Sequence, residues 1–188
     1  MKIVGVIGSI VGSKTKTAME KVEEVFKEKY PEHEIQLLDL AQYQLVFSDG
    51  RHFADYEGDT KFVTETLMAA DAIIIGTPVF QASIPATLKN IFDLLPVNAF
   101  RDKVTSMLVT AGTARHYLMV EQQLKPILAY MKAHIVQTFV FIEEKDFNRK
   151  EIINEDILFR IERLVEDTKL MVDAYSEIRR AKDQEYDF

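Results

Sequence analysis

The segment that follows the first apolar run is dense in groups that can bind an anion. Residues 3–8 are apolar enough for a buried strand, and residues 15–30 have the spacing of an amphipathic helix. The segment between them offers hydroxyl and amino groups from Ser9, Ser13, Lys14 and Thr15. Free N–H groups and the dipole at a helix N-terminus attract anions, and these side chains add donors. The spacing therefore predicts a phosphate-binding loop.

Two other interpretations compete with phosphate binding by this loop. A nucleoside-triphosphate loop of the Walker type needs four residues between its glycines and a lysine directly after the second. Here three residues separate Gly8 from Gly12, and Ser13 precedes Lys14. No apolar strand ends in a carboxylate that could hold Mg²⁺, which also argues against triphosphate chemistry. Simple helix capping and turn formation stays open as the second interpretation.

A second loop follows the apolar run at residues 72–77, whose β-branched residues are typical of a strand buried on both faces. Residues 85–95 then have helical spacing, with Pro85 suited to the first turn and Ser83 predicted as a cap. The loop could form one wall of a slot for a planar ring, with the residues Pro78, Val79, Phe80, Gln81 and Ser83. A simpler role for Phe80, closing the core at the sheet edge, stays open.

A third loop completes the predicted site. Residues 103–110 form another apolar strand, and the loop after it begins with Thr110, Ala111, Gly112 and Thr113. This loop would form the opposite wall of the slot. A phosphate cradle and two walls at one edge of a sheet suggest a mononucleotide with a planar ring, and flavin mononucleotide (FMN) fits best.

The elements that must position these loops alternate between strand and helix. Strands are predicted at 3–8, 35–40, 72–77, 103–110 and 135–142, and helices at about 15–30, 59–70, 85–95, 116–132 and 154–180. The helix at 116–132 should kink or break at Pro126. This pattern predicts the α/β class, with a flavodoxin-like, doubly wound, five-stranded parallel sheet of order 2-1-3-4-5 and helices on both faces. One domain at 1–182 and an acidic, frayed tail at 183–188 are expected.

The composition excludes several other classes of function. The 188 residues contain no Cys, so thiol nucleophiles, disulfides and Cys-ligated clusters are absent. The net charge of −7 argues against binding to nucleic acid. The four His residues lack metal-ligand spacing, so no metal is expected. The apolar run after Met1 and Lys2 is too short for a signal peptide's core, and no apolar run approaches the roughly 18 residues of a membrane span, so we expect a cytoplasmic protein.

The three loops are parts of longer motifs that match a known family. The motifs are Gly8-Ser9, residues 76–83, residues 88–90 with 93–96, residues 110–116 and residues 124–128. Over residues 3–142 the chain resembles the NADPH-dependent FMN reductase family. The last two motifs are similar to the branch that supplies reduced flavin to sulfonate monooxygenases. Three positions depart from the family pattern: Val11 replaces an arginine, Phe80 a tyrosine and Ala111 a glycine.

The resemblance implies an oxidoreductase that uses FMN with NADPH or NADH. Hydride would pass from the nicotinamide to the flavin N5, so no side chain is assigned as acid or base. Electrons would continue to a small acceptor or to a flavin-dependent monooxygenase as partner. A flavodoxin-like electron carrier, a quinone or azo reductase, and a flavin-free binding module on the same fold are the alternatives.

The sequence also predicts self-association. The predicted helices after the third and fourth strands, with the segments beside them, carry more large apolar groups than one sheet face needs: Phe92, Leu95, Phe100, Tyr117, Met119 and Tyr130. A homodimer or homotetramer through these helices is the expectation. An ordinary core stays open as the alternative.

Overall fold

A parallel sheet forms the centre of the protein, whose computed structural model describes residues 1–186. Its order is β2-β1-β3-β4-β5, and β6 also pairs with β4. All of these pairings are parallel. The strands are β1 (Lys2–Ile7), β2 (Glu34–Asp39), β3 (Ala72–Pro78), β4 (Val104–Ala111), β5 (His134–Ile135) and β6 (Val140–Glu143). The predicted fold class and strand order are confirmed.

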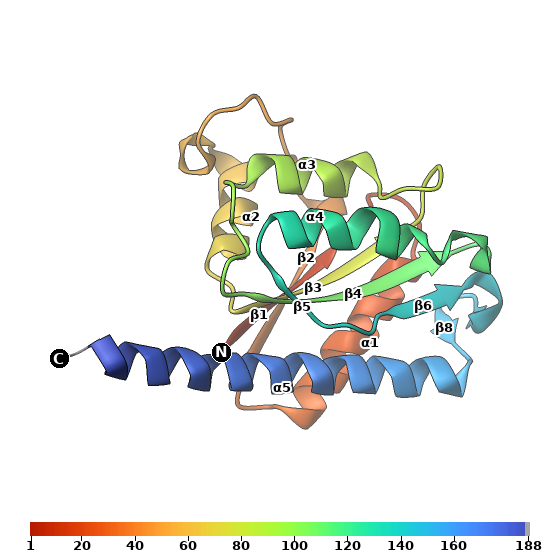
Figure 1. Cartoon of the computed structure of the whole chain (residues 1–188). Coiled ribbons are helices and arrows are strands. Elements are labelled where there is room, and N and C mark those ends of the chain that lie inside the picture. The colour runs from red at the N-terminus through yellow and green to blue at the C-terminus, as the bar shows by residue number, and fades with distance from the viewer. Residues whose placement is uncertain (187–188) are drawn as a thin grey trace.

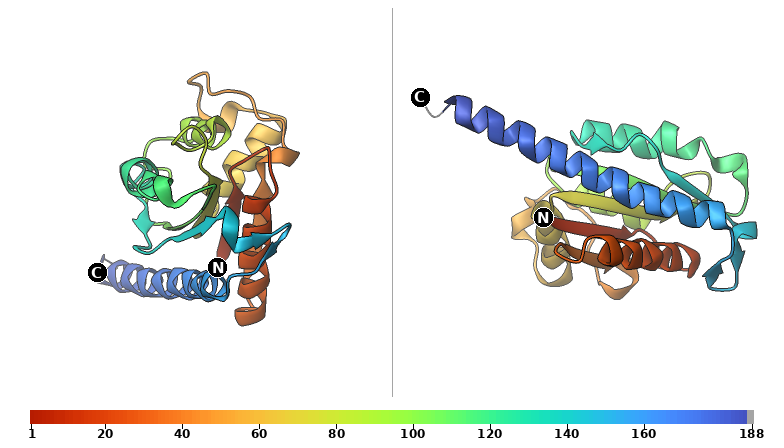
Figure 2. Two further views of the ribbon diagram at one scale, coloured as in Figure 1. Left: turned by 90° about the vertical axis from the view of Figure 1, so that its right-hand side faces the viewer. Right: turned by 90° about the horizontal axis from the view of Figure 1, so that it is seen from below.

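Helices cover both faces of this sheet (Figure 1). They are α1 (Lys14–Lys29), α2 (Gly58–Met68), α3 (Ala86–Leu94), α4 (Lys125–Tyr130) and α5 (Glu155–Tyr186). Two views at right angles show α1 and α5 on one face and α2, α3 and α4 on the other (Figure 2). Each face has its own buried apolar cluster: α2, α3 and α4 contribute to one, α1 and α5 to the other. Burial on both faces explains the nearly continuous apolar sequence of β3.

Shorter elements complete the chain. Single 3₁₀ turns are η1 (Leu40–Gln42), η2 (Phe53–Asp55), η3 (Ala114–His116) and η5 (Glu144–Asp146), while η4 (Val120–Leu124) is a π-helical turn. A small antiparallel pair, β7 (Phe147–Asn148) and β8 (Glu151–Ile152), follows the main sheet. Within residues 1–186, no helix has both the length and the apolar character needed to cross a membrane.

The strand predicted at 135–142 is split into β5 and β6. Thr105 pairs with Ile135, but Leu108 pairs with Val140, so three steps along β4 correspond to five steps along the edge. The two extra residues must leave the ladder, as in an extended bulge. The prediction of one continuous strand was wrong because alternation of apolar residues does not report the register of an edge.

The helix predicted at 116–132 is broken, as Pro126 suggested. The chain passes through η3 and the π-helical η4 before α4 begins at Lys125, and Pro126 lies in the first turn of α4. Pro126 has no N–H to donate, and the wider π-helical turn directly before it, where the Lys125 N–H donates to the Val120 carbonyl, accommodates this loss.

Two expectations about helix ends were wrong. Ser83 does not cap α3: Pro85 is the N-cap residue, and the Ser83 hydroxyl bonds elsewhere. The last helix does not end near Arg180 but continues to Tyr186, into the segment expected as an acidic tail. Ala181, Lys182 and Gln184 have high helix propensity, which favours this continuation. The last two residues of that tail, 187 and 188, lie outside the described part of the chain.

Candidate functional site

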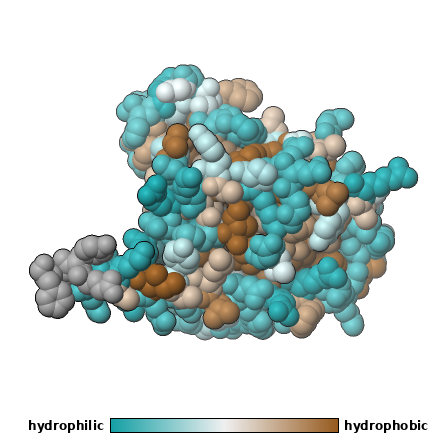
Figure 3. Space-filling model, viewed as in Figure 1, coloured by the Kyte–Doolittle hydropathy of each residue, from teal (hydrophilic) through white to brown (hydrophobic). Residues whose placement is uncertain are grey.

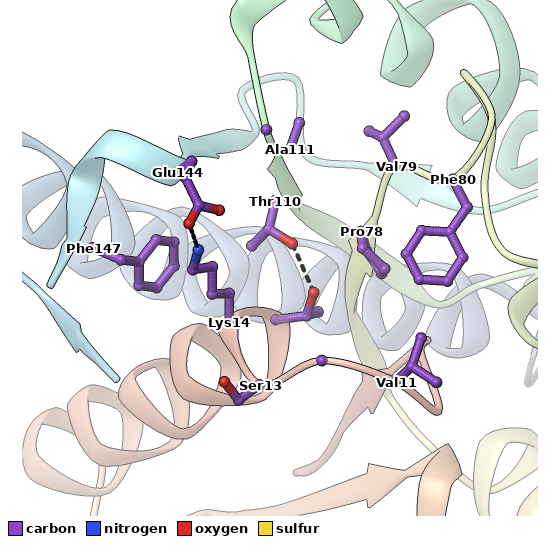
Figure 4. A pocket seen from close by; sticks show the side chains of 13 residues that line it. Val11, Ser13, Lys14, Pro78, Val79, Phe80, Thr110, Ala111, Glu144 and Phe147 are labelled. Carbon is purple, nitrogen blue, oxygen red and sulfur yellow. Dashed lines mark hydrogen bonds and ion pairs between the residues drawn. The ribbon is translucent and has the colours of Figure 1, made fainter. Parts of the chain in front are cut away.

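A pocket of about 370 Å³ lies at the carboxyl ends of β3 and β4, beside the loop that follows β1 (Figure 4). Its volume is within the range of small-molecule sites, and its place is where doubly wound sheets bind ligands. The lining residues come from three loops and the β6–β7 connection: Val11, Gly12, Ser13, Lys14, Thr15, Pro78, Val79, Phe80, Thr110, Ala111, Gly112, Glu144 and Phe147.

The loop after β1 is shaped by one hydroxyl and one glycine. Ser9 Oγ donates to the Val11 carbonyl at 2.6 Å and accepts from the Val11 N–H at 3.1 Å. Gly12 has a φ of +81°, a conformation that other residues adopt at a cost. Ser13 is the N-cap residue of α1, but its side chain makes no capping bond. The Ser13 hydroxyl and the first N–H groups of α1 are therefore available to a ligand.

A charged pair stands at the α1 end of the pocket. Lys14 forms an ion pair with Glu144, and its Nζ lies 5.7 Å from the centre of the Phe147 ring. The side chains of Lys14 and Glu144 are 30% and 65% exposed, so solvent screens their attraction. Lys16, by contrast, bonds to Asp39 at 2.9 Å, which raises the pKa of its amino group. Among the described residues, Lys14 alone brings a cation to the pocket lining.

Two buried threonines join α1 to β4 beneath the pocket. The hydroxyl oxygens of Thr15 and Thr110 lie 2.7 Å apart, and both side chains are buried. This bond fixes the N-terminal turn of α1 against the end of β4. The pocket floor is therefore built from the elements themselves rather than from flexible loops.

The loop after β3 is a tight two-residue turn. The Phe80 N–H donates to the Ser83 carbonyl at 2.9 Å, and the Ser83 N–H donates to the Phe80 carbonyl at 2.9 Å. Val79 is tied to β4, because its N–H donates to the Thr110 carbonyl at 3.0 Å. Phe80 remains 39% exposed at the pocket, so it does not close the core at this edge.

The loop after β4 leaves open space beside the pocket. A Cβ added to Gly112 would meet no described atom within 4 Å. Thr113 turns away: its hydroxyl accepts from the Arg115 N–H at 3.2 Å at the start of η3. Glu143, the last residue of β6, accepts from the Ala114 N–H at 3.0 Å and holds this loop against the β6 edge.

The structure therefore brings together most of the residues predicted for the site. Those in the pocket lining are Ser13, Lys14, Thr15, Pro78, Val79, Phe80, Thr110, Ala111 and Gly112. Four predicted residues lie outside the lining: Ser9, Gln81, Ser83 and Thr113. The hydroxyls of Ser9 and Thr113 bond within their own loops, and the Ser83 hydroxyl bonds to Gln123 in η4.

The prediction missed Val11, Gly12, Glu144 and Phe147. A signal for Glu144 existed, because it follows the last strand of the sheet, and parallel strands end at the same edge. Phe147 reaches the pocket through the short β7–β8 pair, which was not among the predicted strands. Among the described residues, no cluster of three His, Asp or Glu side chains could hold a metal ion.

The lining suits FMN at both ends. Ser13, Lys14 and the α1 N-terminus offer donors and positive charge for a phosphate. Val79, Phe80 and Gly112 offer apolar surface and open space for a flat ring. The buried Thr15–Thr110 pair lies between these ends.

Comparison with known proteins agrees with this geometry. The family model for NADPH-dependent FMN reductases matches residues 1–147. An NAD(P)H-dependent FAD/FMN reductase of Geobacillus thermodenitrificans is 42% identical over 165 residues, which cover 87% of this chain and 89% of the relative. The family model extends over all three loops.

Solved structures share the fold. An NADH:FMN oxidoreductase in its apo form has a TM-score of 0.75 at 21% identity, covering 90% of this chain and 89% of that one. A flavodoxin from the Archaea has a TM-score of 0.62 at 17% identity, with 92% and 99% covered. These likenesses confirm the flavodoxin-like fold, and the family model and the relative in Geobacillus confirm the resemblance read from the motifs. The chain belongs to the NADPH-dependent FMN reductase family and is an oxidoreductase.

Proposed function

We propose that this enzyme reduces FMN with NADPH or NADH and that the pocket at the ends of β3 and β4 is its flavin site. One observation carries the placement: three loops far apart in the sequence, each predicted to contact the flavin, line one pocket. The loops after β1, β3 and β4 meet there because parallel strands end at a common edge of the sheet.

The α1 end of the pocket would bind the phosphate. Ser13 would donate its free hydroxyl, and Lys14 would exchange part of its contact with Glu144 for the phosphate oxygens. The first N–H groups of α1 point in the same direction and favour an anion. Thr15 supports this end through its bond to Thr110 rather than by reaching outward.

The other end would hold the isoalloxazine ring. Phe80 and Val79 form an apolar wall, and Gly112 leaves the ring room on the β4 side. FMN held there would supply the redox chemistry, which is hydride transfer at N5 and onward transfer of electrons to an acceptor. The protein's part is to orient the ring and exclude water, so we assign no side chain as acid or base.

A kinetic assay tests this function. Purified protein is mixed with NADPH or NADH and FMN, and the loss of reduced-nicotinamide absorbance is followed. Oxidation that depends on added FMN and saturates with it supports the proposal. If the protein binds FMN but NADPH or NADH is oxidised no faster than with free FMN in solution, the result would instead indicate an electron carrier. Failure to bind FMN would indicate a flavin-free module.

The electron acceptor is a second part of the proposal. We propose a small acceptor or a flavin-dependent monooxygenase, as the sequence motifs suggested, and the cytoplasmic location that the lengths of the apolar runs suggested. A monooxygenase that receives reduced FMN needs a flavin that leaves its site. The FMN dissociation constant measured before and after reduction tests this, because a flavin retained in both states would contradict release.

Self-association is the third part of the proposal, and the residues that support it differ from those that the sequence suggested. Phe92, Leu95, Phe100 and Met119 are buried within the chain's own core, so they give no evidence for a partner. An apolar groove nevertheless remains between α3 and α4, beside the exposed Val97 and Tyr130 (Figure 3). We propose a homodimer or homotetramer through this face. A monomeric mass by light scattering at micromolar concentration would contradict it.

A further inference from the structure

The turn after β3 holds two residues in a conformation that side chains disfavour. Gln81 and Ala82 have φ values of +48° and +60°. Two-residue hairpin turns with positive φ at both centres favour Asn and Gly there, because a Cβ crowds the backbone in this region. Neither residue relieves that crowding, so the turn does not owe its shape to its own sequence. Contacts from elsewhere must hold it.

Among the described residues, the side-chain hydrogen bonds that join this turn to another element come from one glutamine, which lies 40 residues away from Ser83 in the sequence. The Ser83 hydroxyl donates to Gln123 Oε1, and Gln123 Nε2 donates to the Ala82 carbonyl at 3.3 Å. One amide thus bonds to two neighbouring residues of the turn. Gln123 belongs to η4, the π-helical segment, and π-helical turns often lie at functional sites.

The position of this contact connects it to the pocket. Phe80 begins the turn and lines the pocket, while Ser83, which closes the turn on Phe80, bonds to Gln123. If the turn relaxed toward negative φ, its bonds to Phe80 would be lost and the wall would move. A wall that is fixed in advance binds a ring with less loss of entropy.

We propose that Gln123 is a positioning residue that holds the 80–83 turn in its left-handed conformation and so keeps Phe80 at the wall of the flavin site. This inference rests on the proposed function, because its readout is FMN affinity. Gln123 itself is absent from the pocket lining, so it acts through the turn. Nothing in the local sequence of the loop after β3 reveals this dependence.

Replacement of Gln123 by Leu tests the proposal, with Gln122→Leu as the matched control. Gln122 lies in the same π-helical segment but is exposed, and the structure gives it no side-chain bond to the turn. Loss of two hydrogen bonds should raise the FMN dissociation constant about fivefold to tenfold in Q123L. Q122L should bind FMN like the wild type. Flavin fluorescence titration measures both.

A second substitution separates positioning from general damage. Glycine adopts positive φ without the Cβ penalty, so Ala82→Gly should restore most of the FMN affinity in the Q123L background. If Gln123 served only the structure of η4, the Ala82→Gly substitution would not restore FMN affinity. Gln123→Glu, which keeps the acceptor for Ser83 but loses the donor to Ala82, should fall between the wild type and Q123L.

The outcomes distinguish this inference from the proposed function. If the wild type fails to bind FMN, the assignment of the pocket fails first. If the wild type binds and Q123L binds equally well, the inference is overturned. It is also overturned if Q123L is weakened but A82G gives no rescue, since the defect would then lie outside the turn. Melting temperatures of all four variants show whether each is folded.

Discussion

The two ends of the pocket are held in place by different means. At the α1 end, side-chain interactions hold the geometry: the Ser9 hydroxyl bonds to the Val11 backbone, and Lys14 forms an ion pair with Glu144. At the β3–β4 end the shape of the backbone defines the site, through a tight turn at Phe80, which Gln123 braces from η4, and an open position at Gly112. The first end offers charge and the second offers shape. Substitutions at the two ends should therefore weaken the binding of different parts of the same ligand.

The largest effect is expected at the end defined by shape. Gly112→Val adds a side chain where no described atom stands within 4 Å, so the protein itself has room for it. The same space borders the pocket, and a ring placed there would clash. We expect the FMN dissociation constant to rise about tenfold to a hundredfold, with a corresponding loss of NADPH oxidation at subsaturating FMN.

Melting temperature is the companion measurement for this variant. Gly112 lacks the positive φ that would strain a substituted residue, so stability should change little. A large fall in melting temperature with normal turnover per folded molecule would mean that Gly112 serves only the turn. Riboflavin, which has the same ring without the phosphate, should lose affinity to the same degree as FMN.

A charge change at the α1 end should separate the two flavins. Lys14→Met removes the only cation that the described residues bring to the pocket lining and keeps the length of the stem. A charge-assisted bond to phosphate contributes about 1.5–3 kcal/mol, reduced here because Lys14 must give up part of its pairing with Glu144. We expect FMN affinity to fall about fivefold and riboflavin affinity to stay unchanged. Equal loss for both flavins would place the phosphate elsewhere.

The sequence predicted this division into two ends because strand ends are visible in a sequence. The apolar runs at β1, β3 and β4 were recognisable, and loops after neighbouring parallel strands must meet. Ser13, Lys14, Phe80 and Gly112 could therefore be assigned to one site before any distance was known.

The direction of each loop side chain could not be predicted in the same way. Ser9 and Ser13 have the same chemistry and are four residues apart, yet one bonds within the loop and the other lies in the pocket lining. The bond between Ser83 and Gln123 joins segments 40 residues apart, and Glu144 enters after an irregular edge. Local patterns report the type of element, whereas these contacts depend on how elements pack.

The acidic partner of Lys14 should act in the opposite direction from Lys14. Glu144→Gln removes a negative charge beside the phosphate end and frees the Lys14 amino group. Glu144 is largely exposed and Lys14 partly exposed, so the loss of their ion pair should change the binding free energy of FMN by only about 0.3–1 kcal/mol. FMN should bind about twofold to fivefold more tightly, and the gain should shrink at high salt. Weaker FMN binding would show instead that Glu144 contacts the ligand favourably.

The smallest effect should come from two serines that test side-chain direction within one loop. Ser13→Ala removes a hydroxyl that caps nothing, so FMN affinity should fall about threefold while melting temperature stays constant. Ser9→Ala removes both bonds to Val11, so it should lower stability by about 0.5–1.5 kcal/mol. Any loss of FMN affinity in this variant should come only from the loosened loop. The affinity for inorganic phosphate, measured as a competitor of FMN, should therefore fall by the same factor. If Ser9→Ala lowered FMN affinity more than Ser13→Ala without lowering stability, Ser9 would turn outward to the ligand. Ser9 would then contact the ligand, the role assigned here to Ser13.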